Sequence, residues 1–253
     1  MFIDLTPDQK KLRGELRSYF DALMTPDRKA ATRGMEGGKS YREAIRQIGK
    51  DGWLGVGWPK EFGGGGMTMT EQMIFLEEQR RSGAPFPFVT VSTVGPALID
   101  FGTEEQKAEF LPQILGGECH FSIGYSEPNA GTDLASLTTT AVLEGDEWVI
   151  NGTKMFTSGA TDTDYIWLAA RTDPDAPKHK GITMFIVPAD SPGFSAAPIH
   201  TLSGSATAMS YYENVRIPKE NVVGGVNGGW KLITTQLNHE RVGLAAFGSA
   251  TYA

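Results

Sequence analysis

The 253-residue sequence has little cysteine and little histidine: one cysteine, Cys119, and four scattered histidines. A single cysteine cannot close an internal disulfide, and the histidines show no metal-ligand spacing, so we expect neither a disulfide framework nor a metal site. Clusters of basic residues are also missing beyond Arg80-Arg81 and the stretch 178–180, while the formal net charge is −7. This charge pattern argues against nucleic acid as a partner.

Long apolar runs are absent as well. The longest, Tyr165 to Ala170 and Ile182 to Pro188, are much shorter than the ~20 residues that a transmembrane helix needs. The first residues include an early acid, Asp4, and show neither a basic leader nor an apolar signal segment. We therefore expect no membrane span, no export and a cytoplasmic location.

Helical patterns dominate the first 117 residues. Thr6 to Gln9 and Thr103 to Gln106 both have the capping-box arrangement that opens a helix. Apolar spacing predicts further helices at about 41–50 and 71–81. The tract Ser82 to Phe88 interrupts this pattern with glycine and prolines, and its aromatic side chains are expected to form core or wall rather than a ligand platform.

The pattern changes after Gly117 to short runs rich in Thr, Val, Ile, Tyr and Trp, which are typical of antiparallel strands. Glu144-Gly-Asp146 predicts a hairpin turn between two of them, and helical spacing returns at Trp230. The predicted fold class is therefore multidomain α+β. It comprises an N-terminal α-helical bundle at 1–117, a middle antiparallel β-barrel or sandwich at 118–227, and the first helix of a C-terminal helical bundle at 228–253.

Three segments have side chains suited to binding or chemistry. The first is the turn Gly124 to Asp133, where Ser126 and Thr132 offer hydroxyl groups and Gly131 lets backbone approach a ligand. Its pattern suits the pyrimidine edge of a flavin, although an ordinary surface turn has similar residues.

The second segment follows a predicted strand, where Phe156 and Ser158 are expected to alternate onto one face. An aromatic ring could then pack on a flat heterocycle while the hydroxyl reaches its edge; an exposed hairpin is the alternative. The third segment has Glu240 beside Arg241 on a helix. Neighbouring helix positions point about 100° apart, so one side chain can face a pocket while the other faces a partner, unless both are solvated.

The order of these three segments resembles the acyl-CoA dehydrogenase family over nearly the whole chain. Supporting segments are Trp58-Pro59, Phe110-Leu-Pro112, Val215-x-Ile-Pro218 and Gly228-Gly-Trp230. Within that family the sequence is most similar to actinobacterial members that act on CoA thioesters of steroid side chains, on segments such as Gly55 to Gly64 and Leu232 to Leu237.

The resemblance implies FAD at the junction of the three regions and α,β-dehydrogenation of an acyl-CoA thioester to a 2-enoyl-CoA. It implies Glu240 as the catalytic base, the position used in one branch of the family, whereas most members take the base from a later helical segment. It also implies substrate contacts from Thr132, Asn238 and Arg241. The implied cofactor contacts are Ile123, Tyr125, Ser126, Gly131, Thr132, Phe156 and Ser158.

The resemblance also implies partners: an electron-transfer flavoprotein or another acceptor, and related subunits in a homo- or hetero-oligomer. Two alternatives remain open, an acyl-CoA oxidase type of flavoenzyme and a noncatalytic subunit of a heteromeric dehydrogenase. Family members continue into a C-terminal helical bundle, whereas this sequence stops at Ala253. We therefore expect a truncated chain, in which the apolar face of the last helix, including Leu232 and Ile233, needs a partner from that bundle.

Overall fold

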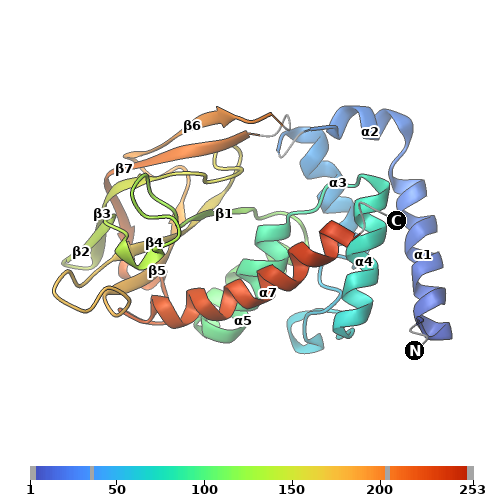
Figure 1. Ribbon diagram of the computed structural model, residues 1–253, viewed down its shortest axis with the longest axis horizontal. Coiled ribbons are helices and arrows are strands. Elements are labelled where there is room, and N and C mark those ends of the chain that lie inside the picture. The colour runs from blue at the N-terminus through green and yellow to red at the C-terminus, as the bar shows by residue number, and fades with distance from the viewer. Residues whose placement is uncertain (1–3, 35–36, 203–205, 250–253) are drawn as a thin grey trace.

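The computed structural model describes residues 4–34, 37–202 and 206–249. It confirms the predicted fold class: a helical first part, a middle β-sheet and a final helix (Figure 1). The helices are α1 (Pro7–Leu23), α2 (Pro26–Thr32), α3 (Lys39–Lys50), α4 (Met69–Ser82), α5 (Gly95–Phe101), α6 (Glu104–Leu115) and α7 (Gly229–Ser249). Short helical turns lie at η1 (Lys60–Phe62), η2 (Val89–Val94), η3 (Leu134–Ser136) and η4 (Lys219–Asn221).

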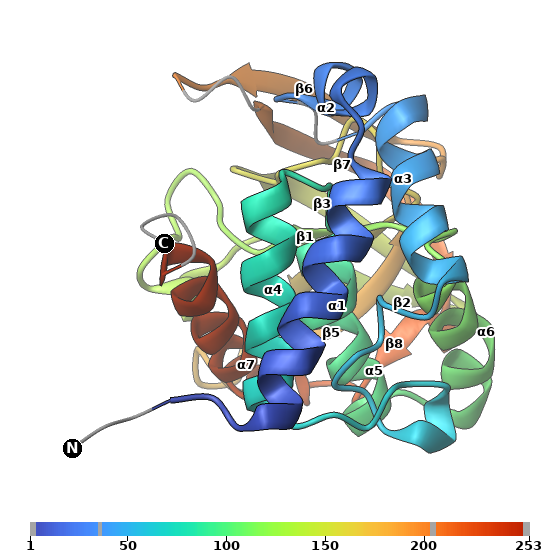
Figure 2. The ribbon, with the colours of Figure 1, turned by 90° about the vertical axis from the view of Figure 1, so that its right-hand side faces the viewer.

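Local signals start the helices as expected. Capping boxes open α1 at Thr6 and α6 at Thr103, and a third opens α4 at Thr68. Helices α1 and α4 lie side by side (Figure 2). The guanidinium of Arg17 forms two hydrogen bonds, of 3.0 and 2.8 Å, with the carboxylate of Glu78 between them. Paired hydrogen bonds of this kind fix the register of the two helices.

The interruption after α4 continues as the π-helical turns of η2 before α5 begins. Gly95 lies against the ring of Trp58, and a Cβ at this glycine would be 1.9 Å from that ring. The Oγ1 of Thr90 accepts a hydrogen bond of 2.9 Å from the backbone N–H of Phe121. These contacts fix the segment 84–90 beside the first strand.

The strands are β1 (Phe121–Gly124), β2 (Thr140–Glu144), β3 (Glu147–Lys154), β4 (Tyr165–Arg171), β5 (Ile182–Pro188), β6 (Phe194–His200), β7 (Ala206–Pro218) and β8 (Val222–Val223). Their order in the sheet is β6-β7-β3-β2-β4-β5-β8, with β1 beside β4. The hairpin predicted at Glu144 to Asp146 joins β2 and β3. Pairing is mostly antiparallel, but β1 runs parallel to β4, and β2 meets β4 in parallel at Thr140 and Arg171.

Strands β4 and β5 are buried on both faces. Trp167 and Ala169 join a core shared with the N-terminal helices, whereas Ile166 and Leu168 face a second core within the sheet. Because successive side chains of a strand point to opposite sides, β4 connects the two cores. Trp167 thereby faces the helical part of the molecule.

Helix α7 crosses the helical core from the sheet toward α4 (Figure 1). Leu232 and Ile233 are buried in the shared core, and Trp230 and Leu237 pack against it. At Leu232 and Ile233 the expectation that this face needs a partner from another domain is therefore wrong, because η2, α4, α5 and β5 of the same chain pack against α7. Farther along α7, Leu244 is 53% exposed.

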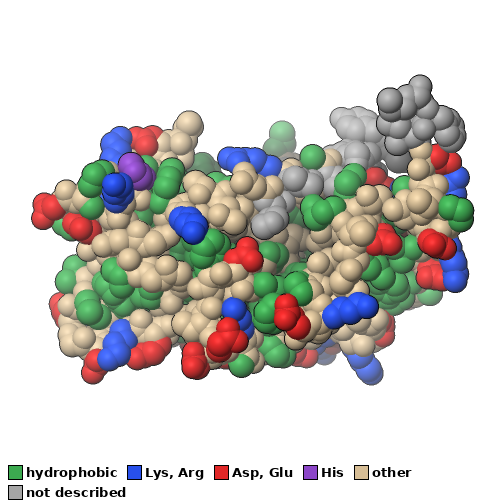
Figure 3. Space-filling view, turned by 90° about the horizontal axis from the view of Figure 1, so that it is seen from below, with side chains coloured by type: hydrophobic (Ala, Val, Ile, Leu, Met, Phe, Trp, Pro, Cys, Tyr) green, Lys and Arg blue, Asp and Glu red, His purple; other side chains and the backbone are tan. Residues whose placement is uncertain are grey.

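The surface mixes charges of both signs, and Figure 3 shows acidic and basic side chains interspersed over one face. Within residues 4–34, 37–202 and 206–249, no helix is both long enough and apolar enough to cross a membrane. The same residues contain no cluster of three or more His, Cys, Asp or Glu side chains arranged to hold a metal ion.

Candidate functional site

The turn at 126–133 is built by its own backbone. Glu127 and Ala130 exchange two backbone hydrogen bonds of 2.8 and 3.1 Å, and the carbonyl of Ser126 accepts one of 2.8 Å from the N–H of Met155. The turn therefore lies beside the segment that follows β3. Gly131 is exposed, and no atom lies within 4 Å of the position that a Cβ would take there, so the packing of the chain does not require a glycine.

A buried ion pair between Lys154 and Glu127 supports this turn. Lys154 is fully buried, and its Nζ donates to the carbonyl of Tyr125 at 3.1 Å and to the carboxylate of Glu127 at 2.8 Å. That carboxylate also accepts from the backbone N–H groups of Thr138 and Thr139, at 2.7 and 2.9 Å. The hydroxyl of Thr138 donates to it as well, at 2.7 Å. Four donors on one buried carboxylate make the position of the turn rigid.

The charges of this pair are set by opposing effects. Burial alone would raise the pKa of Glu127, but the charge and hydrogen bond of Lys154, with the hydrogen bonds from the 138–139 segment, lower that pKa to about 2. Burial lowers the pKa of Lys154 to about 8 although Glu127 opposes the change. Both groups are therefore charged at neutral pH.

We expect Glu127→Gln to remove a pH-dependent part of the stability. The folded-state pKa of Glu127 is about 2 against an ordinary value of 4.5, so its contribution is complete above about pH 4.5 and disappears as the pH falls toward 2. Urea unfolding at several pH values should show a variant that is less stable than the wild type at neutral pH, with a gap that narrows below pH 4.5. A gap that stays constant from pH 6 to pH 2.5 would contradict this assignment.

Tyr125 connects the turn to α7. Its buried hydroxyl donates to Oε1 of Gln236 at 2.7 Å, and Nε1 of Trp167 donates to the same oxygen at 2.8 Å. The side chain of Tyr125 is thus directed toward α7. Ile123, two residues earlier on β1, is half-buried and packs against the shared core.

Phe156 and Ser158 do not alternate on a strand as expected. Strand β3 ends at Lys154, and Phe156 adopts a left-handed backbone conformation with φ of 63°. The N–H of Thr157 donates to the carbonyl of Ala208 at 2.9 Å, which holds this turn against β7. Phe156 is 61% exposed, and the exposed Ser158 donates through Oγ to Oγ1 of Thr207 at 3.2 Å. A left-handed residue of this kind is uncommon and is often found at ligand sites.

On α7, Glu240 and its neighbours face different surroundings. Glu240 is half-buried, and its Oε2 is buried without a hydrogen-bond partner among the described residues. Burial raises the pKa of Glu240, while the guanidinium of Arg241 opposes that change. Arg241 and Asn238 are exposed and hydrogen-bond to each other at 2.9 Å. Glu240 therefore points inward, and the other two point outward.

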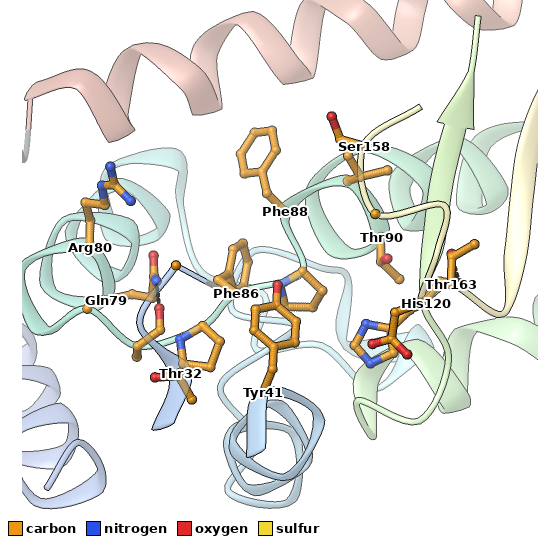
Figure 4. Close-up of a pocket in the computed structure, with 18 of the residues that line it drawn as sticks. Thr32, Tyr41, Gln79, Arg80, Phe86, Phe88, Thr90, His120, Ser158 and Thr163 are labelled. Carbon is orange, nitrogen blue, oxygen red and sulfur yellow. Dashed lines mark hydrogen bonds between the residues drawn. The ribbon is translucent and has the colours of Figure 1, made fainter. Parts of the chain in front are cut away.

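A cavity of about 880 Å³ lies below α7. It is bounded by α2, the start of α3, the end of α4, the segment 84–90, β1 and the loop 158–163 (Figure 4). Phe86 and Phe88 form part of its wall, as the sequence predicted. Gly243 of α7 packs on Phe88, since a Cβ at Gly243 would be 2.6 Å from that ring. The size is in the range of cofactor and substrate pockets.

Two buried polar atoms in the lining have no hydrogen-bond partner within the described part of the chain, Nε2 of His120 and Oε1 of Gln79. Burial, with the charge of Arg42, lowers the pKa of His120, so its imidazole is neutral at neutral pH. Buried polar groups are nearly always paired, and an unpaired one is costly. Both atoms are enclosed by protein, so a ligand in the cavity would reach them only if the lining moved.

The structure brings some of the predicted residues together. Ser158 lines the cavity, the turn at Ser126 is bonded to the segment before Phe156, and Tyr125 is connected to the helix that contains Glu240. The other predicted site residues do not line the cavity: Ile123, Tyr125, Ser126, Gly131, Thr132, Phe156, Asn238, Glu240 and Arg241. Sequence reasoning did not single out His120 or Gln79, because neither lies in a motif and their place in the lining depends on tertiary packing.

Comparison with known proteins gives two family matches. The profile described as "Acyl-CoA dehydrogenase, N-terminal domain" matches residues 6–118, and "Acyl-CoA dehydrogenase, middle domain" matches residues 122–215. Among curated relatives, acyl-CoA dehydrogenase FadE26 of Mycobacterium tuberculosis is 54% identical, covering 97% of this chain and 63% of the relative. FadE29 of the same organism is 55% identical, covering 98% and 64%. The chain thus spans less than two thirds of the length of these relatives.

Solved structures similar to this chain include two that superpose closely. One described as a Tcur3481-Tcur3483 steroid ACAD superposes with a TM-score of 0.94 and 57% identity, covering 99% of this chain and 65% of the other. The ChsE4-ChsE5 complex from Mycobacterium tuberculosis superposes with a TM-score of 0.89 and 54% identity, covering 94% and 61%.

Proposed function

The chain belongs to the acyl-CoA dehydrogenase family, and from that premise we propose that its protein catalyses α,β-dehydrogenation of an acyl-CoA thioester, with FAD as cofactor. The products would be a 2-enoyl-CoA and the reduced cofactor. The observation that carries the proposal is Glu240, whose Oε2 is buried without a partner among the described residues on the helix above the cavity.

We propose that the flavin lies along the turn 123–132 and the segment 156–158, where the exposed, left-handed Phe156 offers a flat ring. The acyl group of the substrate would occupy the adjoining cavity, which Ser158 also lines and to which Phe86 and Phe88 contribute aromatic walls. We propose that the backbone of Ile123 to Ser126, together with Gly131 and Thr132, holds the pyrimidine edge. The ring of Phe156 and the hydroxyl of Ser158 would flank the ring system. When bound, FAD supplies the acceptor for the β hydrogen as hydride.

We assign the removal of the α proton to Glu240. The α proton of a thioester is weakly acidic, so the base that removes it must have a raised pKa and still be ionised. Burial raises the pKa of Glu240 and Arg241 limits the change, which gives a stronger base than an exposed glutamate. Asn238, Arg241 and Thr132 are proposed to contact the CoA thioester, since all three are exposed and polar.

We further propose a bulky, steroid-derived acyl group, because the structural neighbour is named a steroid ACAD and the cavity is about 880 Å³. Two of the similar structures are named for pairs of different proteins, which favours a hetero-oligomer with a related subunit. An electron-transfer flavoprotein is the proposed acceptor of the electrons.

Anaerobic titration of the flavin-loaded protein with acyl-CoA thioesters tests this function. We expect bleaching of the flavin absorbance by a steroid side-chain thioester, and weaker bleaching by linear acyl-CoA of the same chain length. Peroxide formed in air during turnover would point to an oxidase instead. Protein that is flavin-loaded yet not bleached by any thioester would overturn the proposal.

A further inference from the structure

We infer that Gln236 positions the Glu240 carboxyl for proton transfer, by directing its amide Nε2 toward Oε2 of that carboxyl, either directly or through one water. The importance of this arrangement for catalysis rests on the proposed role of Glu240 as the base. The arrangement itself concerns only side chains of this protein and is measurable in the absence of flavin and substrate.

The orientation of the Gln236 amide is fixed by its partners. The indole Nε1–H of Trp167 can only donate a hydrogen bond, so the atom that it meets at 2.8 Å must be the amide oxygen. The hydroxyl of Tyr125 donates to the same oxygen at 2.7 Å. Two donors on Oε1 turn the amide nitrogen of Gln236 away from both β1 and β4. Gln236 is 1% exposed, so solvent does not compete for either end.

The amide nitrogen then lacks a partner. Nε2 of Gln236 is buried and unpaired within the described part of the molecule, and the same is true of Oε2 of Glu240. The two residues are four apart on α7, and side chains at this spacing are neighbours on one helix face. One group is an obligate donor and the other an acceptor. A small rotation of either side chain, or a bridging water, satisfies both.

Few other groups compete for the Glu240 carboxyl. Arg241, on the same helix, is the one whose charge lowers the pKa of Glu240, and the phenol of Tyr125 lies close enough for Glu240 to raise its pKa. The elements packed against α7 include α4, η2, α5 and β5, and Tyr125 and Trp167 meet it at Gln236. Within the described residues, none of these elements contributes a charge that acts on the Glu240 carboxyl. Gln236 is therefore the group placed to select one orientation of Glu240.

Carbon-13 NMR of glutamate-labelled protein tests the inference without flavin, with the Glu240 signal identified by its loss in Glu240→Gln. Removing the donor in Gln236→Met should raise the pKa of Glu240 by about one unit, a tenfold change in ionisation, because a donor to a carboxylate favours its charged form. Trp167→Phe is the matched control: it removes a donor to Oε1 but keeps Nε2, so the pKa of Glu240 should stay near the wild-type value. The pH at which flavin bleaching is half-maximal should shift only in Gln236→Met.

A residue that merely anchors α7 would leave the Glu240 pKa unchanged in Gln236→Met, or shift it equally in both variants; either result overturns the inference. A second measurement needs no change at Gln236. The nitrogen-15 signal of its side-chain amide should titrate with the same midpoint as Glu240, and this titration should vanish in Glu240→Gln. A Gln236 amide signal whose chemical shift does not change with pH in the wild type also refutes the inference. If these signals behave as expected and no thioester bleaches the flavin, only the proposed function fails.

Discussion

Replacing Glu240 with Gln is expected to slow the bleaching of bound flavin by an acyl-CoA thioester by roughly 10²- to 10⁴-fold, the usual contribution of a positioned general base. The amide keeps the shape of the side chain but cannot accept the α proton. Its remaining amide oxygen can still accept the hydrogen bond inferred from Gln236, so the substitution removes the base without removing that acceptor. Stopped-flow absorbance under anaerobic conditions measures the rate directly.

The flavin content of the Glu240→Gln protein should equal that of the wild type, which separates lost chemistry from lost cofactor. Arg241→Gln is a suitable comparison on the next position of α7, since its side chain is exposed and bonded to Asn238. We expect it to change the apparent affinity for the thioester more than the maximal bleaching rate. Wild-type bleaching rates in Glu240→Gln would assign the base elsewhere.

Replacing Lys154 with Met should lower the free energy of unfolding by about 3–5 kcal/mol, the range observed when one partner of a buried ion pair is removed. The variant leaves the carboxylate of Glu127 buried without its cation and the carbonyl of Tyr125 without its donor. Urea unfolding followed by circular dichroism gives the difference. The flavin affinity should fall as well, because the turn at Ser126 loses its support.

The same turn offers a matched control. Lys178 forms an ion pair of 2.7 Å with Asp133, and both side chains are more than half exposed. Lys178→Met should therefore change the stability by less than about 1 kcal/mol. The double variant Lys154→Met/Glu127→Gln should recover part of the stability lost in the single Lys154 variant. If Lys154→Met and Lys178→Met lowered the free energy of unfolding equally, burial would not be what makes the Lys154–Glu127 pair stronger than the Lys178–Asp133 pair.

Most elements of the fold could be predicted because their signals are local. The capping boxes at Thr6 and Thr103, the hairpin turn at Gly145 and the helix beginning near Trp230 each depend on a few adjacent residues. The parallel pairing of β1 with β4 could not be predicted. It joins segments 44 residues apart, Phe121 with Tyr165, through backbone groups that carry no residue-specific signal.

The candidate site was predictable only in part. The sequence indicated Glu240 and the 126–133 turn as single features, but not the pairing of Glu127 with Lys154, because an ion pair between distant residues depends on tertiary packing. The strand alternation expected for Phe156 and Ser158 is not observed, because β3 ends at Lys154, before either residue. The role of each site residue stays a prediction that the experiments above address.

Helix α7 is the last described element to leave the ribosome, yet it completes contacts begun much earlier. Gln236 lies 111 residues after Tyr125 and 69 residues after Trp167 in the chain, so neither hydrogen bond can form until that length has been synthesised. Until then the groove that Leu232 and Ile233 fill is open, an apolar surface of the kind that chaperones recognise and that aggregates when exposed. The nascent protein therefore pairs Gln236 with Tyr125 and Trp167, and buries Leu232 and Ile233, in the same step.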